Sequence, residues 1–474
     1  MALSDIQTIV FCMMENRSFD HALGSLSLDG PGRMPVEGLR SDPDWQDSWT
    51  NFGDDKPYSL LELALADPID DPPHGRERIE TQIDRRAKGQ SAMGGFAQAY
   101  IDSRRGTRPE HYTPHATMGY YTRESVPTFD FFARNYCVCD HWFTPLPLGT
   151  QANRLMAMSG ETRVVDNETG LPNQPLVYDW LKRNAVKWRA YQSGRYFPFF
   201  TMMDKWIYQI LGSLVFGGEF RRYSKFKADW QDRGKAIRPV VFIEPEYSDG
   251  PNSAPNDDHP PTSIAAGQLF LRDVYETLIS NPERWAKTLF IVTYDEHGGF
   301  FDHVPPLAIP ADCGEGPTAR RFERTGPRVP AFLISPFVEA GQVYSGDLDH
   351  TSFLAFLAER FTPGHGYSLA VNERQGRLSG RISAALRQAA RPGPAPRIPE
   401  IETKALLDAA YPARRPAPSA PNTPNAVAFD KVARRVKRER SDIYSHPDMG
   451  DLRDYVREAP SPAPRDKDHI SKHA

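Results

Sequence analysis

Acidic and amide side chains directly follow three short apolar stretches of this sequence. The pairs are Glu15 and Asn16 after residues 6–13, Glu244 and Glu246 after 240–243, and Asp295 and Glu296 after 288–293. Carboxylates that gather in one place repel one another unless a cation neutralises them or a proton is shared. Oxygen ligands with few cysteines suit a hard or borderline divalent ion. The pattern therefore favours a metal site, with helix caps and ordinary turn residues as the alternative.

Histidines cluster next to the same segments, namely His74, His259, His297, His303 and His350. A histidine can contact a phosphoryl oxygen, bind a metal or protonate a leaving group, whereas a single histidine is usually structural or exposed. Gly298 and Gly299 follow His297 and allow the backbone to approach a ligand closely.

A hydroxyl group precedes a helix-like stretch in the middle of the chain. Gly149 and Thr150 follow the turn Pro145-Leu146-Pro147 and precede residues 153–159. The start of a helix gathers free N–H groups and favours anions, so Thr150 either lies in an anion site or only caps the helix. The sequence has no Walker loop, no GxSxG nucleophile motif and no HExxH motif.

The polar segments need a sheet to bring them together, and the apolar stretches predict one. We expect buried strands over 6–13, 240–243, 288–293 and 329–334, the last ending at Ser335. Amphipathic helices are expected over 263–280 and 351–361, the second capped by Asp349 or Thr351. Strands that alternate with helices indicate the α/β class, in which ligands bind beyond the carboxyl ends of the strands.

Composition excludes several classes of protein. The 474 residues are 39% hydrophobic and 25% charged, which is typical of a globular chain, and the net charge of −4 gives no global field for nucleic acid. The longest apolar run, residues 8–14, is too short to span a membrane, so no transmembrane segment is expected. Four cysteines are too few for a disulfide framework, and Cys137-Val-Cys139 lacks the second pair that a metal site needs.

The chain changes in composition near residue 390. Nine prolines fall within 391–425, and a basic cluster of Arg434, Arg435, Lys437, Arg438 and Arg440 follows. The proline-rich part predicts a linker or a chain that wraps the surface. The basic cluster is either a solvated helix face or a patch for anionic lipid or a partner, so peripheral membrane contact stays open.

Five motifs occur in a fixed order and resemble those of a known family. They are residues 14–20 (MENRSFD), 149–155 (GTQANRL), 256–261 (NDDHPP), 294–306 (YDEHGGFFDHVPP) and 349–352 (DHTS). The chain resembles the bacterial phosphoesterase family of non-haemolytic phospholipases C and acid phosphatases. The resemblance implies an alkaline-phosphatase-like fold, with a mostly parallel sheet sandwiched between helices.

The resemblance also implies roles for individual residues. Thr150 would be the nucleophile, His259 would contact phosphate or serve the leaving group, and His74, Asn153 and His350 would bind substrate. One divalent ion would be held by Glu15, Asn16, Asp295 and Glu296, with the Thr150 hydroxyl as a fifth ligand. Hard oxygen donors favour Mg²⁺, Ca²⁺ or Mn²⁺, with Zn²⁺ or Fe as alternatives.

The sequence departs from the family pattern in one respect. Phosphatase members carry an adjacent His pair between the nucleophile and HPP motifs, whereas residues 155–255 contain no histidine here. The missing phosphate contacts would come from Tyr191, Arg195 or other groups.

We expect a phosphoesterase catalytic domain over residues 1–390, with insertion or lid loops at 41–118, and a Pro-rich, basic tail over 391–474. The expected activity is metal-dependent hydrolysis of phosphate esters, similar to that of a phospholipase C. A phosphatase acting on phosphomonoesters and a non-catalytic relative that binds a phosphorylated ligand or a partner are the alternatives. The start of the sequence carries no signal-peptide pattern, so the expected location is cytoplasmic, or secreted without a cleavable signal.

Overall fold

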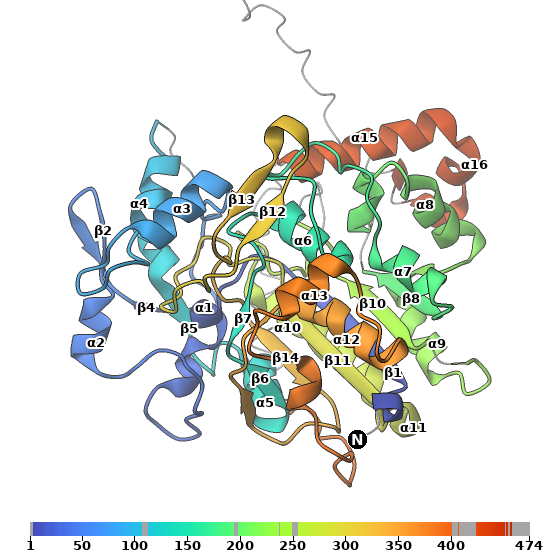
Figure 1. The fold of residues 1–474 in the computed structure, drawn as a ribbon, viewed down its shortest axis with the longest axis horizontal. Coiled ribbons are helices and arrows are strands. Elements are labelled where there is room, and N and C mark those ends of the chain that lie inside the picture. Colours follow the sequence, from blue (N-terminus) through green and yellow to red (C-terminus); the bar gives the residue numbers. More distant parts are fainter. Residues whose placement is uncertain are drawn as a thin grey trace, which may run out of the picture.

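The centre of the molecule is an eight-stranded sheet (Figure 1). The computed structural model describes residues 3–106, 112–193, 198–236, 238–248, 255–400, 406, 423–450, 452–453 and 456. In spatial order the strands are β15 (Gln342–Tyr344), β6 (Cys137–Cys139), β14 (Ala331–Ile334), β11 (Thr288–Tyr294), β1 (Thr8–Met14), β10 (Val240–Glu244), β8 (Trp188–Gln192) and β9 (Phe220–Arg222). Only β14 runs against its neighbours, so the sheet is mostly parallel, as expected.

The predicted strands are present, with one difference in direction. All seven residues of β1 and of β11 are buried, because helices cover both faces of the sheet. The stretch 329–334 forms the antiparallel strand β14. Its carboxyl end therefore lies at the opposite edge of the sheet from those of β1 and β11. The expectation that Ser335 would join the polar strand ends is wrong for this reason.

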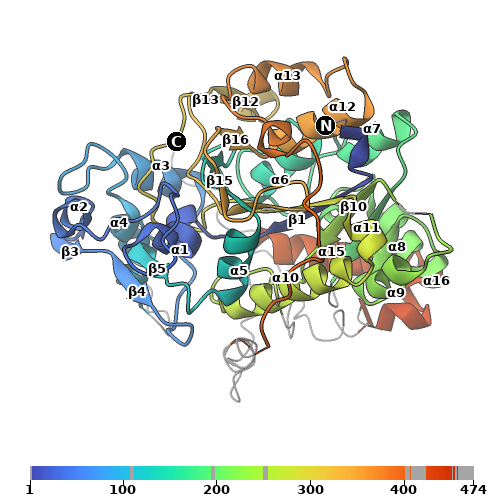
Figure 2. The ribbon, with the colours of Figure 1, turned by 90° about the horizontal axis from the view of Figure 1, so that it is seen from below.

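Two layers of helices enclose the sheet (Figure 2). One layer contains α6 (Thr150–Ser159), α7 (Val177–Arg183), α12 (Thr351–Phe361) and α13 (Leu369–Gln375), and the other contains α5 (Pro127–Asn135), α9 (Phe226–Gln231), α10 (Ile264–Ile279) and α11 (Pro282–Trp285). Phe11 of β1 stacks on Phe353 of α12 with ring centroids 4.1 Å apart. On the other face, Phe332 of β14 packs edge-on against Phe132 of α5. The α/β class is confirmed.

Both helices expected from amphipathic patterns are present. The N-cap of α10 is Ser263, whose side chain accepts a hydrogen bond from Ala265 N. The N-cap of α12 is His350, not Asp349 or Thr351. The Asp349 carboxylate still supports this helix end, because its Oδ1 accepts a hydrogen bond from Thr351 N at 2.8 Å.

A smaller layer built from the first part of the chain lies beside the sheet (Figure 1). It contains α1 (Phe19–Leu23), α2 (Pro43–Ser48), β2 (Asn51–Gly53), β3 (Lys56–Tyr58), β4 (Leu61–Leu63), α3 (Arg76–Asp84), α4 (Phe96–Ser103) and β5 (Gly119–Tyr121). Trp49, Ile83 and Phe96 form part of a separate apolar cluster, which Phe301 joins from the loop after β11. The segment 41–118 therefore contains helices and short strands as well as loops, and its role as a lid stays a prediction.

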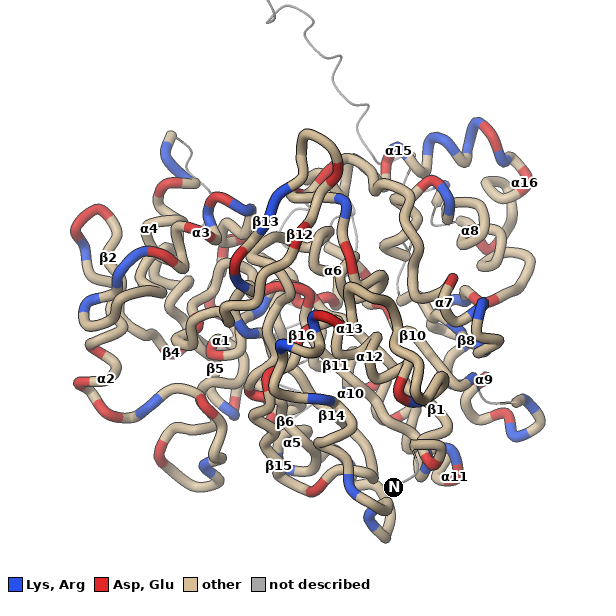
Figure 3. Tube along the Cα trace, viewed as in Figure 1, with Lys and Arg blue, Asp and Glu red and all other residues tan. Residues whose placement is uncertain are grey.

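The C-terminal part packs on the body through α15 (Pro424–Glu439) and α16 (Ser441–Tyr444), next to α8 (Ile207–Phe216). Phe429, Val432 and Val436 of α15 are buried in the main core. Basic residues predominate along α15, between Asp430 and Glu439 (Figure 3). The remaining short strands are β7 (Trp142–Phe143), β12 (Ala311–Cys313), β13 (Arg320–Phe322) and β16 (Leu348–Asp349).

Two further observations concern the chain as a whole. None of the helices in the described ranges is long and apolar enough to cross a bilayer. All four cysteines are buried and free. Of the proline-rich stretch 391–425, residues 401–405 and 407–422 lie outside the described residues.

Candidate active site

The carboxyl ends of β1 and β11 bring two of the predicted polar pairs together. Met14 pairs with Tyr294 in the parallel register, so Glu15 and Asp295 begin their segments at the same level. Asn16 N donates a hydrogen bond to Asp295 Oδ1 at 3.1 Å. The backbone after β11 passes close to the backbone at Asn16. This close passage requires Gly298, which has a φ of +65°, because a Cβ there would lie 2.2 Å from the Asn16 carbonyl oxygen.

Arg154 joins the carboxylates at these two strand ends. Its Nη2 lies 3.1 Å from Glu15 Oε1 and its Nε lies 3.2 Å from Asp295 Oδ2. Its Nη1 also donates to the hydroxyl of Tyr247 at 3.2 Å. Arg154 was not among the predicted site residues, although it follows Thr150 by four residues on the same helix and therefore lies on the same face. One guanidinium offsets about one of the negative charges that Glu15, Asp295 and Glu296 carry when all three are ionised.

Burial and neighbouring charges shift the pKa values of Glu15, Glu296 and His74 in different directions. Burial raises the pKa of Glu15 well above its usual range, against the effect of Arg154. Burial also opposes ionisation of Glu296, but the charges of His74 and His297 outweigh it and lower the pKa of Glu296. For His74, burial favours the neutral form, but the carboxylates of Glu296 and Asp71 outweigh it and raise the pKa. His74 and Glu296 therefore stabilise each other's charge.

His74 and His259 lie together at the same site. Their ring planes are nearly perpendicular, with centroids 5.5 Å apart. One ligand atom each from Asp71, His74 and His259 lie within 4.8 Å of one another. His74 Nε2 is 3.4 Å from Asn16 Nδ2, which connects this group to the end of β1. Sequence reasoning missed Asp71, although it is three residues before His74.

Thr150 is the first residue of α6, with Gly149 as the N-cap. A Cβ added to Gly149 would lie 3.3 Å from the carbonyl oxygen of His74, so the start of α6 adjoins the His74 segment. The expected helix is present, but it begins at Thr150, three residues earlier than the predicted stretch 153–159, and Thr150 is not its N-cap. The role of Thr150 as nucleophile stays a prediction.

Asn153 holds the turn that precedes Thr150. Its Oδ1 accepts a hydrogen bond from Leu146 N at 3.1 Å, and its Nδ2 donates to Leu148 O at 2.6 Å. Both ends of the side-chain amide are thus occupied by the backbone. This geometry fits a residue that positions Thr150, and the expected substrate contact of Asn153 stays a prediction.

His350 is fully buried behind Asp295. Its Nε2 lies 2.8 Å from the Asp295 carbonyl oxygen, and its Nδ1 accepts a hydrogen bond from Trp142 Nε1 at 3.0 Å. Burial lowers the pKa of His350 to about 4, so the ring is neutral near pH 7. Both ring nitrogens are engaged within the protein, and the expected substrate contact of His350 stays a prediction.

Other predicted residues lie outside this group. Glu244 Oε2 accepts hydrogen bonds from Tyr247 and from Phe199 N, so the third acidic pair does not join the cluster through this carboxylate. The Tyr191 hydroxyl donates a hydrogen bond to Asp229 of α9. Arg195 lies outside the described residues. His303 pairs with Asp20 in a second buried group that contains Asp302.

The donor set at the strand ends fits a divalent cation. Glu15 Oε2, Asn16 Oδ1 and Glu296 Oε1 are buried and have no hydrogen-bond partner among the described residues. Buried polar atoms normally find a partner, and oxygens of this kind are the ligands that hard cations prefer. His303, Asp20 and Asp302 are a poorer choice, because the fully buried guanidinium of Arg328 already pairs with both carboxylates.

Comparison with known proteins adds an independent line of argument. The model of the Phosphoesterase family matches residues 6–362, which include every predicted site residue. Non-specific phospholipase C6 of Arabidopsis thaliana is 33% identical over 380 residues, covering 76% of this chain and 68% of that protein. Non-specific phospholipase C1 of the same plant is 34% identical over 366 residues, covering 73% of this chain and 64% of that protein.

A bacterial relative and a solved structure show lower similarity. Phospholipase C A of Mycobacterium tuberculosis is 28% identical over 405 residues, covering 76% of this chain and 73% of that protein. The crystal structure of the phosphonate monoester hydrolase of Agrobacterium radiobacter aligns with a TM-score of 0.32 and 11% identity, over 56% of this chain and 73% of that one.

Proposed function

Because the chain belongs to the phosphoesterase family, we propose that this hydrolase cleaves phosphate esters in the manner of a phospholipase C, with Thr150 as the nucleophile. The observation that carries the proposal is the position of Thr150. It begins α6 beside the His74 segment, and the same helix sends Arg154 to the carboxylates at the ends of β1 and β11.

The proposed reaction has two steps. The Thr150 hydroxyl loses its proton to solvent and its oxygen attacks phosphorus in line with the departing alkoxide, so an O–P bond to Thr150 forms as the ester O–P bond breaks. His259 protonates the alkoxide, which a histidine can do near neutral pH, and becomes neutral. Water then attacks the phosphothreonine, gives a proton to His259 and releases the phosphate or phosphorylated head group, and the Thr150 oxygen takes up a proton from solvent.

Several buried residues support these steps. Arg154 limits the repulsion between Glu15 and Asp295, and Asn153 fixes the turn from which the Thr150 hydroxyl projects. Glu15, Asn16, Asp295 and Glu296, with Thr150 Oγ1, would hold one divalent cation. Such a cation lowers the pKa of a bound hydroxyl and offsets phosphoryl charge. Mg²⁺, Ca²⁺ and Mn²⁺ are the first choices because the donors are hard oxygens.

The proposed substrate class is the phospholipids, on which relatives named phospholipase C act. A phospholipase C breaks a phosphodiester and leaves a phosphorylated head group. The alternatives, a phosphomonoesterase and a non-catalytic binding protein, differ from it in which esters are cleaved and whether any is cleaved. One set of assays separates all three.

We expect Thr150→Ala to abolish hydrolysis of phosphatidylcholine and p-nitrophenyl phosphorylcholine. The fall in rate should exceed the roughly 10²–10⁴-fold that loss of one acid or base group causes. Thr150→Ser keeps a hydroxyl and should retain part of the rate. Thr128→Ala is a matched control, because Thr128 is a buried threonine in the first turn of α5, in the opposite helix layer.

Each contrary outcome has a separate meaning. Full activity of Thr150→Ala would show that another group is the nucleophile. Preference of the wild type for p-nitrophenyl phosphate would reject the phospholipase in favour of a phosphomonoesterase. Absence of hydrolysis of all three esters, with divalent metal supplied, would favour the binding protein.

A further inference from the structure

A cavity lies at the β8–β9 edge of the sheet, away from the candidate active site. Its volume is about 400 Å³, which is in the range of small-molecule sites. Lys187 and Arg238 precede β8 and β10, so the cavity extends toward the amino ends of these strands. The candidate active site follows the carboxyl ends of β1 and β11. The two sites therefore lie toward opposite ends of the parallel strands. The proposed reaction uses no residue of this cavity.

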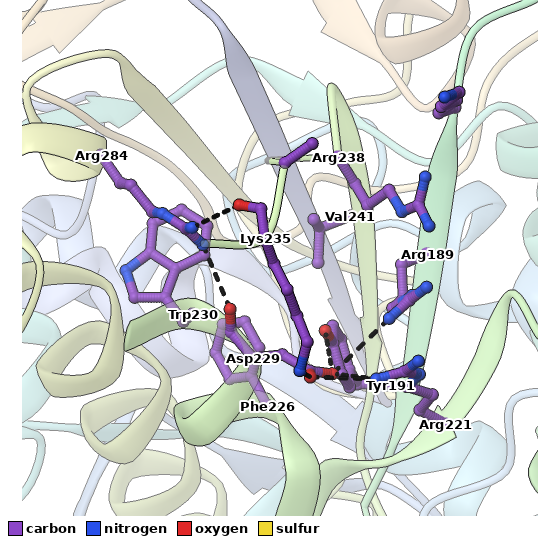
Figure 4. Close-up of a pocket in the computed structure, with 12 residues that line it drawn as sticks. Arg189, Tyr191, Arg221, Phe226, Asp229, Trp230, Lys235, Arg238, Val241 and Arg284 are labelled. Atoms are coloured by element: carbon purple, nitrogen blue, oxygen red, sulfur yellow. Dashed lines mark hydrogen bonds and ion pairs between the residues drawn. The ribbon is translucent and has the colours of Figure 1, made fainter. Parts of the chain in front are cut away.

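The lining of the cavity is strongly basic. Six cationic side chains and one carboxylate line it (Figure 4): Lys187, Arg189, Arg221, Lys235, Arg238 and Arg284, with Asp229. Arg189 and Arg221 lie on strands β8 and β9, Arg284 lies on helix α11, and the other three cations lie in the segments that precede β8 and β10. This excess of positive charge is local, because the whole chain has a net charge of −4.

Asp229 is shared among several of these cations. Its carboxylate lies 2.8 Å from Arg221 Nη1, 3.2 Å from Lys235 Nζ and 3.6 Å from Arg189 Nη1. Figure 4 shows these three side chains converging on Asp229. The Tyr191 hydroxyl donates to the same carboxylate at 3.0 Å. A single carboxylate offsets about one positive charge, so most of the cationic charge is left over.

Lys235 has a second acidic neighbour, Asp232, at 3.2 Å, whereas the remaining cations have less compensation. Arg284 donates to backbone carbonyl oxygens, including those of Asp229 and Lys235, which are uncharged partners. Lys187 and Arg238 form no ion pair with any described residue.

Arg189 is the strongest sign of a missing partner. The residue is only 8% exposed, and its Nε–H is buried with no hydrogen-bond partner in the described part of the chain. A buried donor without a partner costs free energy. An anion in the cavity would offset this cost.

The shape and chemistry of the lining indicate the kind of anion. Arginine presents paired N–H groups that match phosphate oxygens, and several cations together favour more than one phosphate. Tyr191, Phe226 and Trp230 add an aromatic wall, in which neighbouring rings are 4.9 and 6.0 Å apart. Such a wall suits the ring of a phosphorylated polyol.

We propose that this cavity binds a small polyol that carries two or more phosphate groups. The ligand is taken up either as the free compound or as the head group of a phosphoinositide lipid. The site is separate from catalysis, so the proposal stands or falls independently of the function proposed above.

Calorimetric titration with inositol trisphosphate at fixed ionic strength tests the proposal. We expect wild-type protein to bind it at least about tenfold more tightly than orthophosphate, a difference of roughly 1.4 kcal/mol, because its additional phosphate groups contact more of the cations. The double variant Lys187→Ala/Arg238→Ala should weaken binding by about tenfold or more. Lys187→Arg keeps the charge and should bind like wild type. Lys182→Ala removes an exposed lysine at the end of α7 and should change nothing.

Two further measurements complete the test. Sedimentation with phosphatidylcholine vesicles, with and without phosphatidylinositol bisphosphate, distinguishes the sources: binding to both the soluble compound and the doped vesicles supports the lipid head group, and binding to the soluble compound alone supports the free ligand. Hydrolysis of a soluble ester should be the same in the double variant and wild type. Absence of trisphosphate binding, or equal affinity in wild type and the double variant, would overturn the proposal.

Discussion

Three buried oxygen atoms define the candidate active site at the scale of single residues. Glu15 Oε2, Asn16 Oδ1 and Glu296 Oε1 have no hydrogen-bond partner among the described residues. Each such group costs about 1–3 kcal/mol when it is left unsatisfied. Their collection at two adjacent strand ends is therefore better explained by a bound cation than by three separate defects.

Removal of divalent metal should lower both the activity and the thermal stability of the protein. A ligand that binds only the folded state stabilises it by about 2.7 kcal/mol at a hundred times its Kd. Melting curves and ester hydrolysis before chelation, after it, and after addition of Mg²⁺, Ca²⁺ or Mn²⁺ check this, with elemental analysis of the purified protein. In Glu296→Gln the melting temperature should respond much less to metal. Identical melting and activity after complete metal removal would contradict the prediction.

The residues of the site differ in how far the sequence could predict them. Glu15, Asn16, Asp295 and Glu296 were expected to meet, because each pair follows an apolar strand and parallel strands end at one edge. Arg154 was not expected, because its ion-pair partners Glu15 and Asp295 follow two strands that are distant from it in the sequence. The engagement of both His350 nitrogens depends on Trp142 and the Asp295 carbonyl group, which no local pattern reveals.

At the scale of elements, His141 links two segments that are far apart in the sequence. Its Nε2 is 2.7 Å from Glu37 Oε2, and its Nδ1 is 2.9 Å from Asp347 Oδ1, next to β16. Burial alone would lower the pKa of His141, but hydrogen bonds to these two carboxylates outweigh it and raise the pKa above 6.5. The charged histidine is therefore favoured in the folded state.

This link should stabilise the fold more in weak acid than in weak base. A histidine whose pKa is raised on folding contributes its full stabilisation below its unfolded pKa, and loses it as pH rises through the folded value. We expect His141→Gln to lower the free energy of unfolding near about pH 5.5 by up to ~1 kcal/mol, since Glu37 is half exposed. The loss should fade above the folded pKa. Urea unfolding of both proteins across this range measures it, and a pH-independent difference would argue against the link.

At the scale of the whole molecule, the sequence predicted the sheet better than its surroundings. β1 and β11 were recognisable because strands buried on both faces are almost entirely apolar. The direction of β14 was not, because it depends on pairing with β11 and β6 and not on its own residues. Within 41–118, helices as short as α2 have too few turns to show a clear helical period of apolar residues. The apolar cluster of this segment also includes Phe301, which comes from the loop after β11.

The last helices connect the end of the chain to the candidate active site. Asn425 Oδ1 of α15 accepts a hydrogen bond at 2.8 Å from Gln151, the neighbour of Thr150. Phe429 stacks on Tyr247, with ring centroids 6.4 Å apart, and Tyr247 in turn contacts Arg154. The outer arginines are mostly paired, as Arg435 is with Asp204 at 2.6 Å. These contacts favour a structural role of α15 over a role only in membrane targeting.

Truncation after Ala390 should therefore reduce solubility, melting temperature and hydrolysis of a soluble ester together. Burial of Phe429, Val432 and Val436 is worth about 1.5–3 kcal/mol for each side chain, which is a large part of the roughly 5–15 kcal/mol that holds a domain folded. The control is Lys437→Ala/Arg438→Ala in the full chain, which changes the charge of α15 without removing its buried face and should keep soluble-ester turnover. If the truncated protein instead hydrolyses the soluble ester at the full rate and loses only its action on vesicles of anionic lipid, the tail is a targeting element, and the structural role is wrong.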